Sequence, residues 1–417
     1  MSRLFFLSLP VLTLALTHSP AADWPRFRGP NGSGVAEGKL PEIDPKAPLW
    51  KVAIPGRGSG SPIVVAGKVY LQTASVNGQT RTLLCLDAAT GKTLWSKDAP
   101  GKTAKTHAKN SLASGTPACD GETVLCVWWD GSGVALHAYD TGGKEKWQTS
   151  LGGYVSQHGP GMSPVVHEGL AFVNVDDDER AELVAIDVKT GDKKWVVDRR
   201  HHRACYSSPT LLKRGDRPVE LLLGTTRAIT SYDPATGKVN WQYDLTWPAG
   251  SMPLRVIAHP VYAGGLVVMS CGDGGGARYM IAVDPEKPKP AKAWELSRDV
   301  PYVPCILVKS DPKAGDLLFW VNDPIAGGSA VCAEAKTGKA LFNAQTTTKP
   351  SSSSPVMAGD EILTIADDGE FVVFKAETTF DDVRRGKLGQ GVIASPAVAD
   401  GRLYVRGTTH LFCFGGK

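Results

Sequence analysis

Hydrophobic and polar positions along the chain repeat one short pattern, which is clearest at residues 183–195. An apolar run from Leu183 ends in Ala185-Ile186, Asp187 and Gly191 follow at turn positions, and Trp195 opens the next apolar stretch. Asp accepts hydrogen bonds from the backbone ahead of it, and Gly adopts the positive φ that tight hairpin turns require. The pattern therefore predicts two β-strands joined by a tight turn.

The same unit recurs throughout the chain. Its small-residue position, Ala185 in the best copy, falls also at Cys85, Ala138, Ser231, Ala282, Cys332, Val373 and Cys413. The mean step is about 47 residues, close to the ~40–50 residues of a four-stranded propeller blade. The 46 Gly and 29 Pro are spread along the chain, and no helical period of useful length is present. Together these features predict an all-β fold.

A proline marks a second position in each repeat, ahead of an apolar strand and a turn. The eight prolines are Pro62, Pro117, Pro164, Pro209, Pro260, Pro304, Pro355 and Pro396. Proline has no N–H to donate, so it belongs where a strand begins. Each repeat then has four strands, except that the last ends at Cys413-Phe414 without a fourth. We expect residues 49–52 to supply it, so that residues 49–417 form an eight-bladed β-propeller closed by an N-terminal strand.

An aromatic residue opens the last strand of most repeats. These residues are Trp50, Trp95, Trp147, Trp195, Trp241, Trp294 and Phe342. A buried Trp removes ~150–250 Å² of surface from water. We expect these side chains to dock between neighbouring blades and hold the ring together.

The first residues have the layout of a secretory signal peptide. Arg3 precedes an apolar run from Leu4 to Leu16, and Ser19 and Ala21 stand at the small-residue positions before a cleavage site. The run is shorter than a membrane span, and an uncleaved anchor is the alternative. We expect a signal peptide at residues 1–21, an arm at 22–48 packed on the outside of the fold, and a secreted or periplasmic protein with no transmembrane span after cleavage.

The net charge of +4 is too small to indicate a nucleic-acid or membrane partner, and we expect a monomer. Export would place the eight cysteines in a compartment that permits disulfides. Cys85, Cys332 and Cys413 occupy the small position of the repeat and are expected to pack as small hydrophobes. No pairing can be deduced for the other five.

The acidic run Asp176-Asp177-Asp178-Glu179 lies between two predicted strands. Four carboxylates in a turn could take Ca²⁺, but the spacing of an EF-hand is missing. A solvated hairpin tip is the interpretation that the sequence favours.

The unit Ala-x-Asp-x-x-Thr-Gly-x-x-x-Trp at 185–195 resembles the tryptophan-docking repeat of pyrroloquinoline-quinone-type propellers. The segments 24–32, 107–111 and 158–164 also resemble secreted propellers of planctomycete-type bacteria, a resemblance that brings no established activity. The wider resemblance implies one of two roles. Quinoprotein alcohol dehydrogenases hold the quinone and Ca²⁺ in the central funnel, whereas the outer-membrane assembly lipoprotein uses a bare propeller to bind proteins.

The departures from both branches bear on function. No two cysteines are adjacent here, whereas the dehydrogenases resemble one another in a vicinal Cys-Cys ring over the quinone. Their catalytic Asp and Ca²⁺ carboxylate match no motif of this chain. The lipidated Cys of the lipoprotein is also missing, since no Cys precedes Cys85.

Loops that enter the first strand of each blade converge near the funnel of a propeller, so polar residues before the eight prolines are the candidate ligand-binding residues. They are Arg57, His107, Lys109, Asn110, His158, His201, His202, Arg203, Arg255 and His259. The guanidinium groups, whose N–H donors lie in one plane, and the imidazoles at these positions could bind an anionic or polyhydroxyl ligand or an acidic protein segment. Alternatively, they hydrogen-bond neighbouring loops or face water. A metal site at His107, His158 and His201 would need these residues to converge, and none is predicted.

The sequence thus favours an exported, non-catalytic binding scaffold for a protein, a glycan or a small anionic ligand at the funnel. The alternative is an enzyme, either a divergent quinoprotein oxidoreductase or another funnel-based enzyme. No catalytic residue or cofactor is predicted, and pyrroloquinoline quinone with Ca²⁺ has no motif to support it.

Overall fold

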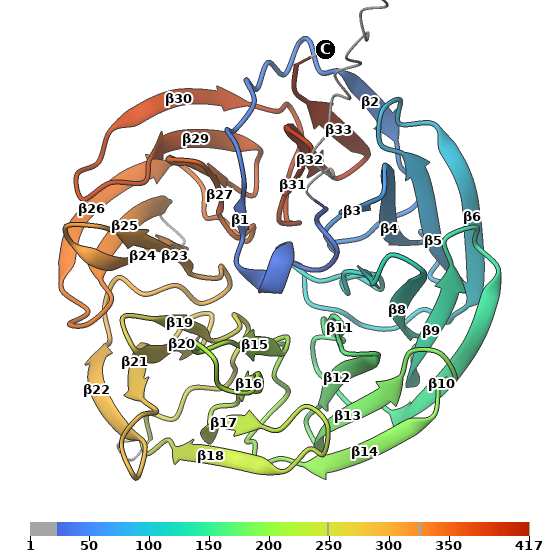
Figure 1. Cartoon of the computed structure of the whole chain (residues 1–417). Helices are drawn as coiled ribbons and strands as arrows, with labels where there is room; N and C mark the ends of the chain where they lie inside the picture. The colour runs from blue at the N-terminus through green and yellow to red at the C-terminus, as the bar shows by residue number, and fades with distance from the viewer. Residues whose placement is uncertain (1–22, 248–249, 324–326, 417) are drawn as a thin grey trace, which may run out of the picture.

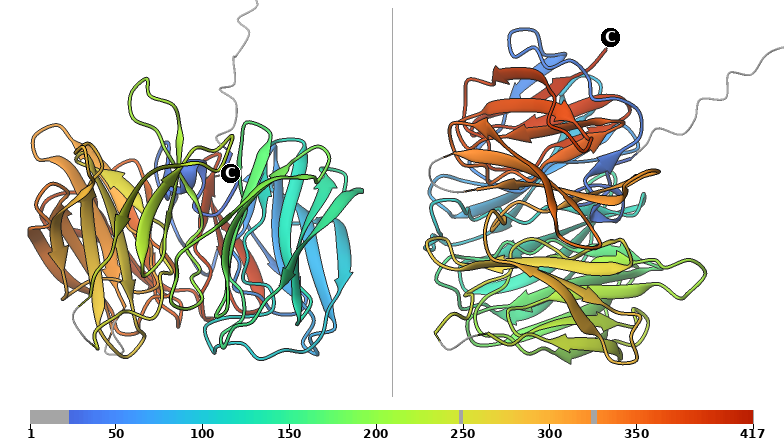
Figure 2. Two further views of the ribbon diagram at one scale, coloured as in Figure 1. Left: turned by 90° about the horizontal axis from the view of Figure 1, so that it is seen from below. Right: turned by 90° about the vertical axis from the view of Figure 1, so that its left-hand side faces the viewer.

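The computed structural model describes residues 23–416 apart from 248–249 and 324–326, so the predicted signal peptide lies outside the described residues. Eight β-sheets stand side by side around a central channel (Figure 1). Seen from the edge, the strands run across the thickness of the ring (Figure 2). The prediction of an all-β, eight-bladed propeller is confirmed.

Each blade has four strands in antiparallel order from the channel outward. Blade 1 comprises β3 (Ile63–Val65), β4 (Lys68–Ala74), β5 (Thr80–Asp87) and β6 (Thr93–Pro100), and blade 2 comprises β7 (Ala118–Cys119), β8 (Thr123–Trp129), β9 (Gly133–Asp140) and β10 (Glu145–Gly153). Blade 3 comprises β11 (Val165–His167), β12 (Leu170–Asp176), β13 (Ala181–Asp187) and β14 (Lys193–Asp198), and blade 4 comprises β15 (Thr210–Leu212), β16 (Glu220–Gly224), β17 (Ala228–Tyr232) and β18 (Val239–Asp244).

The second half of the ring follows the same order. Blade 5 comprises β19 (Val261–Ala263), β20 (Leu266–Gly272), β21 (Arg278–Asp284) and β22 (Ala291–Leu296), and blade 6 comprises β23 (Leu307–Asp311), β24 (Gly315–Asn322), β25 (Gly328–Glu334) and β26 (Ala340–Thr347). Blade 7 comprises β27 (Val356–Ala358), β28 (Glu361–Ile365), β29 (Glu370–Lys375) and β30 (Asp382–Lys387), and blade 8 comprises β31 (Ala397–Ala399), β32 (Arg402–Arg406), β33 (His410–Phe414) and β2 (Trp50–Ala53).

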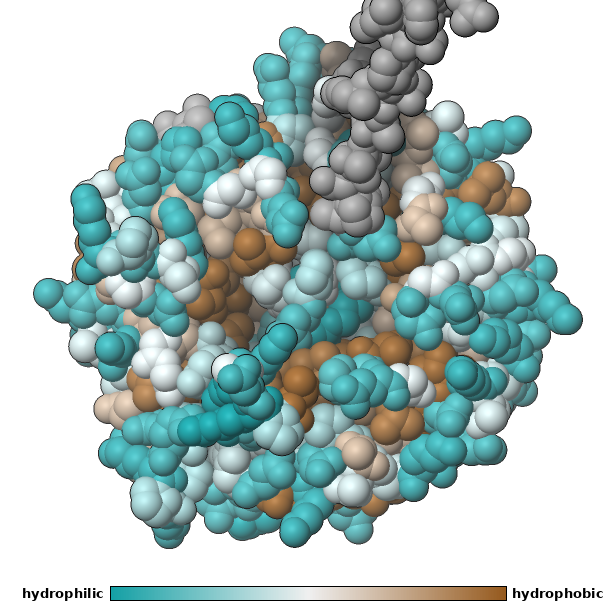
Figure 3. Space-filling model, viewed as in Figure 1, coloured by the Kyte–Doolittle hydropathy of each residue, from teal (hydrophilic) through white to brown (hydrophobic). Residues whose placement is uncertain are grey.

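Burial differs between the inner and outer strands of a blade. Every residue of β8 is buried, whereas β14 alternates between exposed and half-buried residues. An inner strand is covered on both faces by neighbouring blades and is therefore apolar throughout, whereas an outer strand has one wet face. On the face seen in Figure 3, hydrophilic side chains cover the rim and hydrophobic ones show mostly nearer the centre.

The N-terminal strand closes the ring as the sequence predicted. β2 pairs antiparallel with β33, with Trp50 opposite Cys413 and Ala53 opposite His410. The pairing joins strands that lie far apart in the sequence and leaves β33 with a partner on each side. An unpaired β33 would offer a row of free backbone groups to other chains.

The repeat's Trp and Gly meet at the joint between neighbouring blades. The indole N–H of Trp195 donates to the carbonyl oxygen of Pro234 in the next blade at 3.1 Å. The Trp195 ring covers Gly237, where an added Cβ would lie 2.8 Å from the indole Cδ2. Gly237 has φ +72°, so the position needs glycine for its backbone as well as for the space.

The same joint recurs at four other aromatic residues, and the remaining two differ. The indole N–H groups of Trp50, Trp95, Trp147 and Trp294 also donate to carbonyls of the following blade. Trp241 instead donates to the Glu220 carboxylate of its own blade at 2.8 Å. Phe342 has no N–H and lies against Phe374 and Phe380.

We expect Trp195→Ala to lower the free energy of unfolding by about 2–4 kcal/mol, because the ring is half-buried rather than fully buried. Trp195→Phe keeps most of the packing and should cost about 1 kcal/mol for the lost hydrogen bond. Denaturant unfolding monitored by circular dichroism measures both. A loss below about 1 kcal/mol for the alanine variant would exclude the packing role.

The N-terminal arm crosses the central channel, so the expectation that it packs on the outside is wrong (Figure 1). Trp24 pairs with Val64 of β3 through two backbone hydrogen bonds of 2.7 and 3.0 Å. A short 3₁₀ turn, η1 (Pro30–Gly32), follows, and Asn31 bonds the backbone of Leu211 in blade 4. β1 (Val35–Ala36) then adds to β27 of blade 7 as a parallel fifth strand.

Arg28 explains why the arm can lie inside the ring. Its side chain is fully buried and donates to the carbonyl oxygens of Ile306 at 3.1 Å and Pro355 at 2.7 Å, in blades 6 and 7. Two further carbonyls, of Gly32 and Ser33, come from the arm itself. The carbonyls around the channel thus satisfy a charge that would otherwise be costly to bury.

The acidic turn is partly buried, so its interpretation as a solvated tip is wrong for Asp176 and Asp177. Arg199 donates to both carboxylate oxygens of Asp176, at 2.7 and 2.5 Å, and both side chains are almost completely buried. Within residues 23–416 as described, no group of three His, Cys, Asp or Glu side chains could hold a metal ion.

All eight cysteines are buried and free, and Cys85, Cys332 and Cys413 lie in hydrophobic clusters as expected. No helix in the described part of the chain is long and apolar enough to span a bilayer.

Candidate functional site

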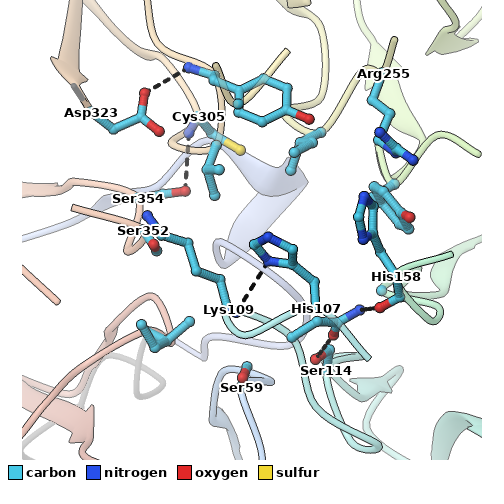
Figure 4. A pocket seen from close by; sticks show the side chains of 18 of the residues that line it. Ser59, His107, Lys109, Ser114, His158, Arg255, Cys305, Asp323, Ser352 and Ser354 are labelled. Carbon is cyan, nitrogen blue, oxygen red and sulfur yellow. Dashed lines mark hydrogen bonds between the residues drawn. The ribbon is translucent and has the colours of Figure 1, made fainter. Parts of the chain in front are cut away.

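A cavity of about 810 Å³ occupies the channel. Phe27 of the arm lines it, together with the loops that lead into the first strands of the blades. Figure 4 looks into this cavity. The arm therefore turns an open channel into a cavity that is lined by the arm as well as by the blades.

One residue of each blade forms a ring around the channel, always two positions before the first strand. These ring residues are Ser61, Thr116, Ser163, Ser208, His259, Cys305, Ser354 and Ser395. Backbone N–H groups link successive members: Ser61 donates to the Thr116 hydroxyl and Thr116 to the Ser163 hydroxyl, each at 3.0 Å. Cys305 donates likewise to Ser354 at 3.0 Å, and Ser354 to Ser395 at 2.9 Å. Hydroxyls are suited to this role because each accepts the neighbour's N–H and keeps a proton of its own.

Blade 6 departs from the proline register that the sequence suggested. In the other blades the proline stands directly before the first strand, but β23 begins at Leu307, three residues after Pro304. Cys305 and Ile306 occupy the places of Ser and Pro, as the Cys305–Ser354 hydrogen bond shows. Aligning the prolines therefore hid Cys305 as the ring residue of blade 6.

Five of the ten predicted ligand-binding residues line the cavity: His107, Lys109, Asn110, His158 and Arg255. His259 is buried beside it and bonds the arm. Arg57, His201, His202 and Arg203 are not among the lining residues, so the structure does not bring these four to the cavity. Arg203 lies 3.5 Å from Asp178 instead.

Most charged groups of the cavity have partners within the protein. Arg278 donates to Asp323 at 2.7 Å, and Nζ of Lys109 lies 3.1 Å from a carboxylate oxygen of Asp367. His107 and His158 meet edge to face, with ring centroids 4.9 Å apart. Burial and the charge of Arg255 lower the pKa of His158, which keeps this ring neutral at pH 7.

Arg255 is the exception. Its side chain is 4% exposed, yet among the described residues its Nε and Nη2 have no hydrogen-bond partner and its guanidinium has no ion pair. The phenols of Tyr206 and Tyr302 line the same cavity and form hydrogen bonds with the Arg255 side chain, but they are neutral partners. Burial raises the pKa of Tyr302 to about 12 although Arg255 acts to lower it, so both phenols stay neutral and cannot balance the charge. A buried cation with free N–H donors is costly unless an anion completes it.

Sequence reasoning missed part of the cavity. Tyr206, Arg278 and Asp323 line it but were not among the candidates. Arg278 and Asp323 follow their prolines by more than fifteen residues, whereas Tyr206 stands three residues before Pro209. Asp273, at the Gly-rich turn after β20, is a further charge at the lining. A serine or threonine stands before six of the eight prolines and was a usable signal for the ring, but small polar residues are common in turns and do not by themselves indicate a functional position.

The sequence model of one protein family, described as outer membrane protein assembly factor BamB, matches residues 33–125 and 82–297. The matched residues make up more than half of the chain. The chain belongs to this family.

Solved structures of other BamB-type and quinoprotein propellers share the fold. A europium-containing methanol dehydrogenase aligns with a TM-score of 0.66 at 14% identity, over 95% of this chain and 98% of that one. BamB from Moraxella catarrhalis aligns with a TM-score of 0.63 at 14% identity, over 88% and 99%. Quinohemoprotein alcohol dehydrogenase from Comamonas testosteroni aligns with 0.65 at 17%, over 95% and 81%. These identities support the fold alone. No curated protein matches the sequence.

Proposed function

We propose that this BamB-type propeller is an exported monomer that binds a small anionic ligand in its central cavity, with Arg255 as the anchoring cation. The observation that carries the proposal is the buried guanidinium, which has no ion pair among the described residues and two nitrogen atoms, Nε and Nη2, without a hydrogen-bond partner. Arg presents a planar fork of donors that matches a carboxylate. An anion bound there would replace the water that the burial of Arg255 removes.

The size of the cavity favours a small molecule over a protein segment. Small-molecule sites are typically ~300–1,000 Å³, and this cavity has about 810 Å³. The arm occupies part of the channel, and with it space that a bare propeller would offer to a peptide. The ring hydroxyls and tyrosines supply further donors for a polyhydroxyl acid.

Pyrroloquinoline quinone with Ca²⁺ does not fit this set of residues. Asp323 is already paired with Arg278, and no three acidic, His or Cys side chains converge within the part of the chain that is described. No two cysteines are adjacent, so the vicinal disulfide that the dehydrogenases share cannot form. We therefore derive no function through the quinone.

Arg255→Gln tests the proposal because it removes the charge and keeps a similar shape. We expect the affinity for a small carboxylate to fall about tenfold or more, since a charge-assisted hydrogen bond contributes about 1.5–3 kcal/mol. Ligands are found first by the rise in melting temperature over a panel of small mono- and dicarboxylates, sugar acids and their methyl esters. Calorimetric titration then gives the dissociation constants.

Arg203→Gln is the matched control, because Arg203 pairs with Asp178 and does not line the cavity. It should leave the affinity unchanged. Equal binding of the methyl esters, or an unchanged affinity in the Arg255→Gln variant, would contradict the proposal.

A further inference from the structure

Two neighbouring members of the ring break its chemical pattern. Six of the eight ring residues carry a hydroxyl group, whereas blade 5 has His259 and blade 6 has Cys305. The two exceptions lie next to each other, with Sγ of Cys305 3.5 Å from Nδ1 of His259. A serine or threonine at both places could accept the backbone N–H of the neighbouring blade, as these residues do elsewhere in the ring. The linking of blades therefore does not explain why His and Cys stand here.

The arm fixes the orientation of His259. The Nε2 atom of His259 lies 2.9 Å from the carbonyl oxygen of Gly32, and a carbonyl only accepts, so Nε2 carries a hydrogen. Nδ1 is then the nitrogen that faces the thiol and can take its proton. A nucleophile, a base and a third group that orients the base are the parts of an activated nucleophile.

The electrostatic surroundings favour the thiolate. Burial alone would raise the pKa of the Cys305 thiol, but the charge of His259, the hydrogen bond to it and the Arg28 guanidinium together lower this pKa to about 6. At Cys332, by contrast, burial raises the pKa of the thiol to about 12. His259 and Arg28 are the ionisable groups that act on the Cys305 sulfur to lower its pKa.

Cys305 is also placed where a ligand could meet it. It lines the central cavity, as Arg255 does, and the other seven cysteines are not among the lining residues of the described structure (Figure 4). The buried guanidinium of Arg255 has no ion pair among the described residues, and its Nε and Nη2 have no hydrogen-bond partner, which is independent evidence that this cavity receives an anion. A nucleophile and an anion anchor thus share one cavity.

We propose that Cys305 is a nucleophile and His259 its general base, and that the cavity transfers acyl groups from small esters or thioesters that carry a carboxylate. His259 Nδ1 takes the thiol proton, and Sγ bonds to the carbonyl carbon. The bond from that carbon to the alkoxide or thiolate breaks, and the leaving group receives the proton from His259. Water then hydrolyses the Cys305 thioester, which releases the acid and restores the thiol. The choice of an anionic substrate rests on the anion binding proposed above, whereas the nucleophile does not.

The first test alkylates the folded protein with iodoacetamide from pH 5 to 9 and locates the adduct by peptide mass spectrometry. We expect Cys305 to react and Cys332 to stay unmodified until the protein is unfolded. The rate should fall as the pH drops through about 6, because the thiolate is then protonated. The quantity to measure is the midpoint of the curve of alkylation rate against pH. The plateau rate is less informative, because a thiolate of lower pKa is also intrinsically less nucleophilic. In a folded His259→Asn variant the midpoint should move toward the ordinary value of about 8.5.

The second test compares 4-nitrophenyl hemisuccinate with neutral 4-nitrophenyl acetate. We expect release of 4-nitrophenolate and an acyl adduct on Cys305, faster with the hemisuccinate, and neither in Cys305→Ser. Arg255→Gln should slow the hemisuccinate about tenfold or more relative to the acetate, so that the preference for the anionic ester is lost.

The outcomes separate the two proposals. A Cys305 that stays unmodified in the folded wild-type protein, or that titrates near pH 8.5, overturns the nucleophile without reliance on any variant. Acylation by both esters at equal rates leaves the nucleophile in place but overturns the anionic substrate and the anion-binding function. Carboxylate binding that depends on Arg255, together with an inert Cys305, overturns only the acyl transfer.

Discussion

A chain that lacks residues 23–55 is expected to aggregate instead of folding to a monomer with a cooperative melting transition. The deletion removes β2 and leaves the backbone groups of β33 without a partner at an exposed edge. It also removes Arg28 and Trp24, whose hydrogen bonds and packing join blades 1, 6 and 7. Size-exclusion chromatography and differential scanning calorimetry measure the outcome.

Two shorter deletions separate the contributions. A chain that begins at residue 23 is the control and should behave as the full chain does after loss of the predicted signal peptide. A chain that begins at residue 37 loses the arm's crossing of the channel but keeps β2, so it should remain a monomer with a lower melting temperature. If removal of residues 23–55 gave a monomer that melts cooperatively, closure by β2 would not be required for folding.

Asp176→Asn is expected to lower the free energy of unfolding by about 3–5 kcal/mol, because it leaves the buried Arg199 guanidinium without its counter-charge. Both side chains are almost completely shielded from water, so solvent screening does not reduce this cost. Arg199→Met alone should cost a similar amount, since Asp176 then loses its partner. Chemical denaturation of each variant gives the values.

The double variant, Asp176→Asn with Arg199→Met, is the informative comparison. Removal of both charges should recover part of the loss, because a buried ion pair and an uncharged replacement often differ little in stability. The double-mutant cycle isolates the pairwise contribution. Additive losses would mean that the two side chains act independently.

The ring could be predicted from the sequence because its rules are local. Asp187 and Gly191 indicate a turn, and Trp195 indicates the start of the next strand, without reference to distant residues. The same residue types recur at a nearly constant spacing. Closure by residues 49–52 followed because the last repeat lacked one strand. The hydrogen bond of Trp241 could not be predicted from the repeat, since its acceptor Glu220 lies on β16 of the same blade and not in a turn of the next one.

The interior of the channel could not be predicted in the same way. The arm was expected on the outside because the carbonyls that bind Arg28 belong to blades 6 and 7, about 280 and 330 residues away. Asp176 was expected in a solvated turn for a similar reason, since its partner Arg199 follows only after two further strands. Of the candidate site, His158 and Arg255 were found because they precede prolines, whereas Cys305 was missed because Pro304 is displaced from the usual register.

The N-terminal position of the arm has a consequence for the time course of folding. Trp50 is synthesised early, but its strand partner Cys413 is among the last residues made. At ~5–20 residues per second, the interval between the two is roughly 20–70 s. During that interval Arg28 and β2 lack their final partners in blades 6, 7 and 8, and they need to avoid wrong pairings with strands that are already formed. Closure can therefore occur only after β33 has been made, and because it joins such distant residues we expect it to limit the folding rate.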